Sequence, residues 1–95
     1  DLALELAGHD VDTVVGRGWA GIKNGDLLRR MSDDYDVLIT MDRGIEFQHP
    51  IERFPFGVVI AHAASNRLQH LRPLVPAILA AIASITPGQV QRAGA

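Results

Sequence analysis

Two short apolar runs, at residues 36–40 and 57–61, constrain the fold of this chain more than any other feature of its sequence. Each has the length of a β-strand, and a strand that does not alternate apolar with polar side chains is typical of a parallel sheet covered on both faces. A helical pattern at 24–33 precedes the first run, and another at 67–84 follows the second. This alternation predicts an α/β domain with a parallel sheet flanked by helices.

Weaker patterns add three elements. Residues 10–15 alternate and are rich in Val and Thr, which predicts a further strand. We expect a last edge strand at residues 89–92. We also expect a single helical turn at Ile45–Gln48, within an otherwise irregular connection. Pro73 and Pro76 interrupt the pattern at 67–84, so we expect that helix to be kinked or restarted there.

Length and composition limit the classes of protein. A chain of 95 residues with 47% hydrophobic residues suits one domain, residues 1–95. Its net charge of −2 argues against a generic basic nucleic-acid coat but allows a local basic cleft. The absence of cysteine excludes disulfides and thiolate metal sites and fits a cytoplasmic protein. No apolar run is long enough to span a membrane, so no membrane partner is expected.

Two carboxylates are the best candidates for chemistry, because ligands of open α/β sheets bind beyond the carboxyl ends of the strands. Asp42 follows the 36–40 strand, where it can hold a hard cation such as Mg²⁺ or merely cap a turn. Asp26 lies in the first turn of a helix that Asn24 is expected to cap, and there it can simply interact with the helix dipole. If the two converge, they can share one Mg²⁺ ion.

Cationic and polar side chains near the same strand ends complete the candidate site. Lys23, Arg43 and Arg67 are candidates for binding phosphate, although a solvated surface charge is the simpler interpretation of each. Ser65 and Asn66 begin the helix at 67–84, where Asn66 can act as a plain N-cap. With Thr40, these two residues are candidates for a supporting role around the site.

Four motifs, taken in order, resemble one PIN-like family whose bacterial members are usually regarded as toxin-like or of unknown function. The motifs are GHDV at 8–11, GWAGIKNG at 18–25, DVLITMDR at 36–43 and SNRL at 65–68. The resemblance implies a three-layer, Rossmann-like parallel sheet flanked by helices. It also implies a nuclease whose acidic residues hold Mg²⁺ or Mn²⁺ and activate water against an RNA phosphodiester. Asp42 matches the acid after the T-x-D strand, and Asp26 matches the acid that opens the preceding helix.

The chain departs from this family pattern at two places. The family starts with a central strand that ends in an Asp, and nothing here matches that N-terminal strand. A further polar residue often stands two positions after the T-x-D acid, where this chain has Gly44. We therefore expect weak stability, self-association as a homo-oligomer, and little RNA cleavage.

Three hypotheses follow from these residues and this resemblance. The first is a metal-dependent ribonuclease of toxin–antitoxin type, with RNA as substrate and an antitoxin protein as partner, impaired in this chain. The second is a catalytically idle PIN-like module that mainly binds a partner protein. The third is a receiver-like domain in which Asp42 accepts phosphate, although the acidic pair and the lysine that such a domain needs are missing.

Overall fold

A parallel three-stranded sheet forms the centre of the protein in a computed structural model that describes residues 6, 8–9, 11, 17–19, 21–63 and 67–94. Its strands run in the order β1 (Val37–Thr40), β2 (Gly57–Ala61) and β3 (Val90–Ala93). The strands predicted at 36–40, 57–61 and 89–92 are thus confirmed, with shifts of one residue at some ends. The strand predicted at 10–15 lies, apart from Val11, outside the described residues.

The register of the sheet follows from its two parallel ladders. Val37 pairs with Gly57 on β2, and Val58 pairs with Val90 on β3. All five residues of the central strand β2 are buried, whereas the four residues of β1 are only partly buried. The central position of β2 in the sheet explains why all of its residues are apolar. Among the described residues, β1 pairs only with β2.

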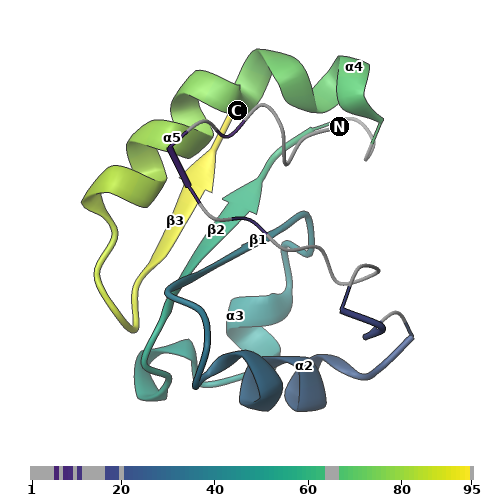
Figure 1. Ribbon diagram of the computed structural model, residues 1–95, viewed down its shortest axis with the longest axis vertical. Helices are drawn as coiled ribbons and strands as arrows, with labels where there is room; N and C mark the ends of the chain where they lie inside the picture. Colours follow the sequence, from purple (N-terminus) through teal and green to yellow (C-terminus); the bar gives the residue numbers. More distant parts are fainter. Residues whose placement is uncertain are drawn as a thin grey trace.

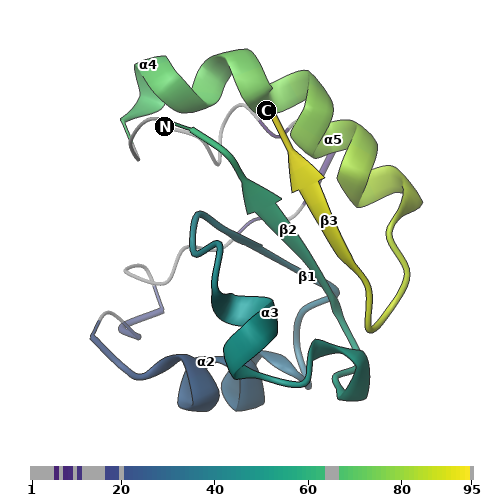
Figure 2. The same cartoon turned by 180° about the vertical axis from the view of Figure 1, so that it is seen from behind.

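Helices cover both faces of this sheet, as Figures 1 and 2 show. On one face lie α4 (Leu68–Leu71), the 3-10 helix η2 (Arg72–Leu74) and α5 (Val75–Ser84). On the other lie α2 (Asn24–Met31), α3 (Ile45–Gln48) and the 3-10 helix η1 (Ile51–Arg53). The helical turn expected at 45–48 is thus confirmed as α3.

Two hydrophobic clusters, one on each face of the sheet, hold these layers together. The alternate side chains of β2 divide between them, because neighbouring residues of a strand point to opposite faces. One cluster joins Val59 to Ile78 and Ala81 of α5. The other joins Val58 and Ile60 to the helices of the opposite face through the buried side chains of Leu28, Met31, Ile45, Ile51 and Phe56.

The start of α2 differs from the sequence prediction, whereas the interruption of the helix at 67–84 agrees with it. Asn24 is the first residue of α2 rather than its cap, and Lys23, with φ −70° and ψ 151°, occupies the cap position without a side-chain hydrogen bond. Lysine has no acceptor for the free N–H groups of the first turn, so α2 begins without the stabilisation that an asparagine cap would supply. The long helix at 67–84 is broken as expected: a 3-10 segment containing Pro73 separates α4 from α5.

Trp19 illustrates how the glycine-rich loop before α2 is anchored. Its ring meets that of Tyr35 edge to face, with centroids 6.1 Å apart, and it packs against the cluster of the α2 face. The Arg17 guanidinium lies over the Trp19 ring, 4.8 Å from its centroid. These contacts hold Trp19 against the α2 side of the sheet and anchor the loop that leads into α2.

Candidate functional site

Asp42 lies just beyond the carboxyl end of β1, as its position in the sequence predicts. The Thr40 hydroxyl accepts a hydrogen bond from the Asp42 N–H at 3.1 Å. Asp42 Oδ1 in turn accepts one from the Gly44 N–H at 3.0 Å. The carboxylate therefore stabilises the turn that leads from β1 into α3. Thr40 thus contacts the backbone of Asp42, and its supporting role in a metal or catalytic site stays a prediction.

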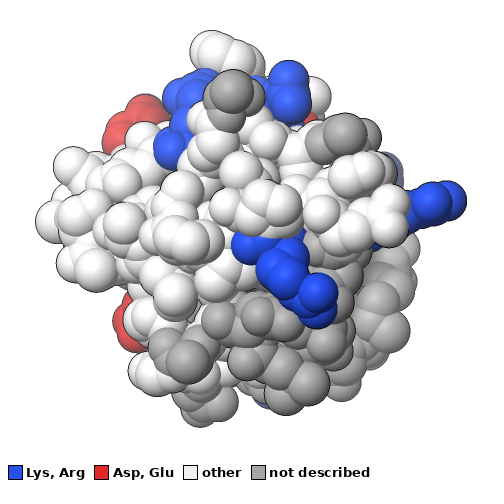
Figure 3. Space-filling model, turned by 90° about the horizontal axis from the view of Figure 1, so that it is seen from above, with Lys and Arg blue, Asp and Glu red and all other residues white. Residues whose placement is uncertain are grey.

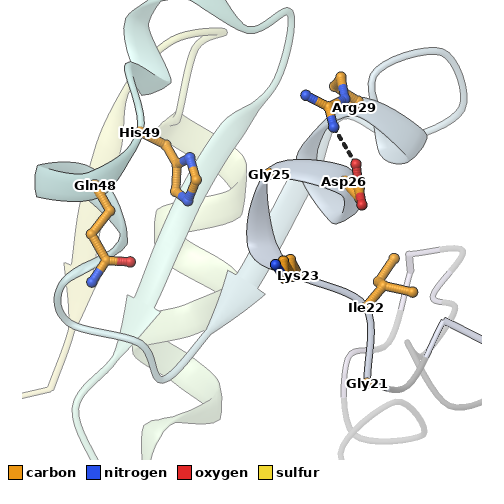
Figure 4. Close-up of a pocket in the computed structure, with 8 residues that line it drawn as sticks. All are labelled: Gly21, Ile22, Lys23, Gly25, Asp26, Arg29, Gln48 and His49. Atoms are coloured by element: carbon orange, nitrogen blue, oxygen red, sulfur yellow. Dashed lines mark hydrogen bonds and ion pairs between the residues drawn. The ribbon is translucent and has the colours of Figure 1, made fainter.

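Asp26 lies on the wall of an open pocket of about 680 Å³ between the start of α2 and the end of α3. Figure 4 shows Lys23, Gly25, Asp26 and Arg29 on one side and Gln48 and His49 on the other. The loop residues Gly21 and Ile22 complete the lining. Asp26 is paired with the guanidinium of Arg29, one helical turn further along α2.

The pocket brings some of the predicted site residues together and leaves others out. Lys23 and Asp26 both line it, whereas Asp42 does not. Gln48 and His49 stand at the carboxyl end of α3, whereas Asp42 stands before its amino end, so the two carboxylates lie toward opposite ends of this short helix. The shared metal site of Asp26 and Asp42 stays a prediction. Over the described ranges, no three Asp, Glu or His side chains are grouped as ligands of one metal ion.

The remaining predicted residues lie on the surface or outside the described part of the chain. Arg43 is exposed in the turn after Asp42, and Arg67 is exposed directly before α4. Ser65 and Asn66 lie outside the described residues, so their supporting role stays a prediction.

An ion pair that the sequence analysis missed joins Glu46 of α3 to Arg92 of β3. Arg92 is in register with Ile60, which is in register with Thr40, so the three residues form one row across the sheet near its carboxyl edge. The pair ties the segment after Asp42 to the far strand. The sequence placed Glu46 in the predicted helical turn and Arg92 at the end of the predicted edge strand, but no local pattern linked the two residues.

Gln48 and His49 are the other residues that sequence reasoning missed. They lie in the connection between two strands, where the sequence has no clear periodicity of apolar residues. They line a pocket with residues of α2 because α3 folds back toward that helix. The contact is close: a Cβ at Gly25 would stand 3.6 Å from His49 Cε1. A side chain at this position would therefore meet His49 at ordinary van der Waals distance, which shows how closely the end of α3 approaches the first turn of α2.

The charges of the pocket suit a small polar or anionic ligand. Lys23 and Arg29 supply two cations and Asp26 one anion, while Gln48 and His49 add groups that can donate hydrogen bonds. The Asp26–Arg29 pair neutralises part of this charge, which leaves Lys23 as the pocket cation without a salt bridge among those recorded for the described residues. The pocket can therefore orient a phosphate or carboxylate group, with Lys23 as its main point charge.

No helix within the described ranges has both the length and the apolar character needed to cross a membrane. Comparisons with known proteins found no matching family model, no matching curated protein and no matching solved structure.

Proposed function

We propose that this protein is a metal-dependent ribonuclease of the PIN-like, toxin–antitoxin type, acting on cytoplasmic RNA and only weakly active as the present chain. The observation that carries the proposal is the place of Asp42, directly beyond the carboxyl end of a strand in a parallel α/β sheet. Ligands of this fold class bind at that edge. The resemblance of residues 36–43 to the T-x-D motif supports the same residue.

In this proposal Asp42 and Asp26 hold one Mg²⁺ or Mn²⁺ ion, and Lys23, Arg43 and Arg67 bind RNA phosphates. Carboxylate oxygens are the protein ligands that both ions prefer. The bound ion would activate water and offset the charge of the phosphodiester. Because Arg29 already pairs with Asp26, metal binding has to replace that contact, which is one reason to expect low activity.

A second candidate is a catalytically idle module that binds a partner protein such as an antitoxin. It is favoured by the state of both carboxylates, which are engaged within the chain by Arg29 and by the Gly44 N–H. The side chain of Phe47 on α3 is 81% exposed, and an exposed aromatic side chain suits a protein contact.

Substitution of Asp42 by Asn separates its structural role from metal binding. Asn keeps an oxygen that accepts the Gly44 N–H, so we expect a change in unfolding free energy within about 0.5 kcal/mol. Alanine lacks that oxygen, and Asp42→Ala is expected to cost about 0.5–2 kcal/mol. Asp42→Asn should nevertheless abolish any RNA cleavage that depends on Mg²⁺ or Mn²⁺.

The assay is cleavage of a labelled single-stranded RNA with either ion, with EDTA as the control, next to thermal melts of all three proteins. Equal cleavage by the wild type and Asp42→Asn would refute the proposed role of Asp42. A wild type that shows no metal-dependent cleavage, and whose melting temperature does not respond to either ion, would refute the ribonuclease and leave the binding module.

A further inference from the structure

The walls of the pocket between α2 and α3 carry polar side chains from two separate parts of the chain. Lys23 directly precedes α2, whereas Gln48 and His49 stand at the end of α3. Among the described residues, no hydrogen bond or ion pair is recorded for the side chains of these three. They are therefore available to a ligand, and Figure 4 shows Lys23 on one side of the pocket and the other two across from it.

The lining of the pocket is positive once its internal ion pair is counted. Asp26 and Arg29 pair with each other, so their charges cancel. Lys23 adds one positive charge, and the Gln48 amide and the His49 ring add hydrogen-bond donors. An ammonium group surrounded by donors suits a compact anion with several acceptor oxygens. A phosphate group fits this description better than a carboxylate, which has fewer acceptors and a single charge.

The shape of the pocket favours a phosphate at the end of a molecule over one within a chain. Its walls converge where α3 approaches α2, because a Cβ at Gly25 would stand 3.6 Å from His49 Cε1. A phosphodiester within an RNA strand has a nucleotide on each side and needs a groove that is open at both ends, whereas a terminal phosphate needs one entrance. The volume of about 680 Å³ is in the range of small-molecule sites, and Ile22 offers an apolar contact to the organic part of a ligand.

The charges on another face of the protein also favour a local site over a long track. Figure 3 shows the surface over α4 and α5, where the Lys and Arg side chains of the described residues stand in separate groups with uncharged surface between them. A nucleic-acid strand bound along its length needs a continuous row of cations. This face does not supply one.

We propose that the pocket between α2 and α3 binds a phosphomonoester, with the Lys23 ammonium as its cation and the Gln48 amide and His49 ring as hydrogen-bond donors. At neutral pH such a group carries about 1.5–2 negative charges and three strong acceptor oxygens. The same chemistry occurs on a free nucleotide and at the phosphorylated end of an RNA. The inference rests on the proposed function only in the role of Lys23 as a phosphate ligand, and it does not require that the protein cleave RNA.

Gln48 also connects the pocket with Asp42. Gln48 Nε2 and Asp42 Oδ1 lie 3.5 Å and 3.6 Å from one point, the position that a Cβ at Gly44 would take. A phosphomonoester in the pocket would therefore lie beside the carboxylate that we propose for metal binding. An RNA whose end is held there has its next nucleotides near Asp42, so a phosphorylated end should increase any cleavage.

Nitrogen–proton correlation NMR in EDTA tests the pocket without any cleavage. The ligands are adenosine monophosphate, adenosine, acetate and a dinucleoside monophosphate, whose phosphate is a diester. We expect adenosine monophosphate to shift the backbone amide signals of the pocket, including that of Gly25, with a dissociation constant of about 0.1–1 mM. The other three ligands should bind at least about tenfold more weakly, because each lacks the terminal phosphate.

Single substitutions locate the binding site. Lys23→Gln removes the pocket cation, and Gln48→Glu places a carboxylate against the phosphate, so each should weaken binding of adenosine monophosphate at least about fivefold. Arg30→Gln is the matched control: it removes one positive charge from α2, but Arg30 is exposed and does not line the pocket. It should change the dissociation constant less than about twofold. Thermal melts verify that all three variants fold.

Three results would overturn the proposal. The first is no binding of adenosine monophosphate by the wild type up to about 10 mM. The second is equally tight binding of acetate or of the diester. The third is an equal loss of affinity in Arg30→Gln and Lys23→Gln, which would indicate attraction by overall charge.

Fluorescence anisotropy of labelled RNA in EDTA separates the two sources of the phosphomonoester. At least about threefold tighter binding of an oligonucleotide with a terminal phosphate than of one with hydroxyl ends, lost in Lys23→Gln, identifies an RNA end. Equal binding of both, next to binding of adenosine monophosphate, identifies a free nucleotide-like ligand. Binding of adenosine monophosphate without any metal-dependent RNA cleavage refutes the ribonuclease and supports the pocket. Cleavage without such binding refutes the pocket and supports the ribonuclease.

Discussion

Replacing Gly44 by Asp should place a second carboxylate beside Asp42 and create metal-dependent stability. The backbone allows the change, because Gly44 has φ −95° and ψ −4°, which other residues adopt without strain. A Cβ there would stand 3.6 Å from Asp42 Oδ1 and 3.5 Å from Gln48 Nε2, both ordinary contacts. The Gly44 N–H that binds Asp42 is kept, so the turn into α3 is preserved.

Opposing terms set the stability of Gly44→Asp without metal. Removing a glycine from a compatible position stabilises by about 0.4–1 kcal/mol, and an Asp at the N-cap of α3 adds a few tenths. Two carboxylates roughly 5 Å apart repel each other by about 1–3 kcal/mol at the surface. We therefore expect a change in unfolding free energy between about zero and 2 kcal/mol of destabilisation.

Metal should reverse this loss. Binding at a hundredfold excess over the dissociation constant returns about 2.7 kcal/mol, and for a domain of this size each kcal/mol shifts the melting temperature by about 4–8 °C. The matched control is Gly44→Asn, which has the same shape without the charge. It should melt higher than the wild type without metal and respond to MgCl₂ no more than the wild type does.

The assay is differential scanning fluorimetry of the wild type, Gly44→Asp and Gly44→Asn with EDTA, MgCl₂ or MnCl₂ at constant ionic strength. The reasoning predicts a melting temperature for Gly44→Asp that rises with metal by at least about 5 °C more than for Gly44→Asn. An equal response of all three proteins would show that Asp42 does not bind metal in the proposed way.

Two other predictions concern stability and activity. Ile78→Ala should lower the free energy of unfolding by about 2–5 kcal/mol, because Ile78 is fully buried. Ile82→Ala on the same helix should lower it clearly less, since Ile82 is only partly buried. Equal losses of stability in urea unfolding would contradict the packing of α5. A chain extended at its N-terminus by a strand that ends in Asp should melt higher and cleave RNA faster, because the PIN-like family that the sequence resembles begins with such a strand and its Asp would add a third carboxylate to the proposed metal site. If the extension changes neither melting temperature nor cleavage, the resemblance to the PIN-like family is not a guide to this protein.

The sequence alone was enough for the main elements of the fold. The apolar runs at 36–40 and 57–61 predicted two parallel strands, and Pro73 predicted the break between α4 and α5. These features depend on local patterns, since strand burial and helix interruption follow from a few neighbouring residues. The sequence predicted Asn24 as the N-cap of α2, whereas the structure has Lys23 there, one residue earlier. Cap preferences alone do not determine a helix boundary to within one residue.

The tertiary structure decided which side chains meet. The pocket joins Lys23 and Asp26 to His49, and the ion pair joins Glu46 to Arg92, across separations of more than twenty residues. The sequence identified Asp42 as a candidate at the end of β1, but only the structure shows its carboxylate bound to the turn before α3. Local patterns record the burial of a strand or helix, whereas contacts between distant residues depend on how α3 packs against α2 and how β3 adds to the sheet. No short stretch of sequence carries that information.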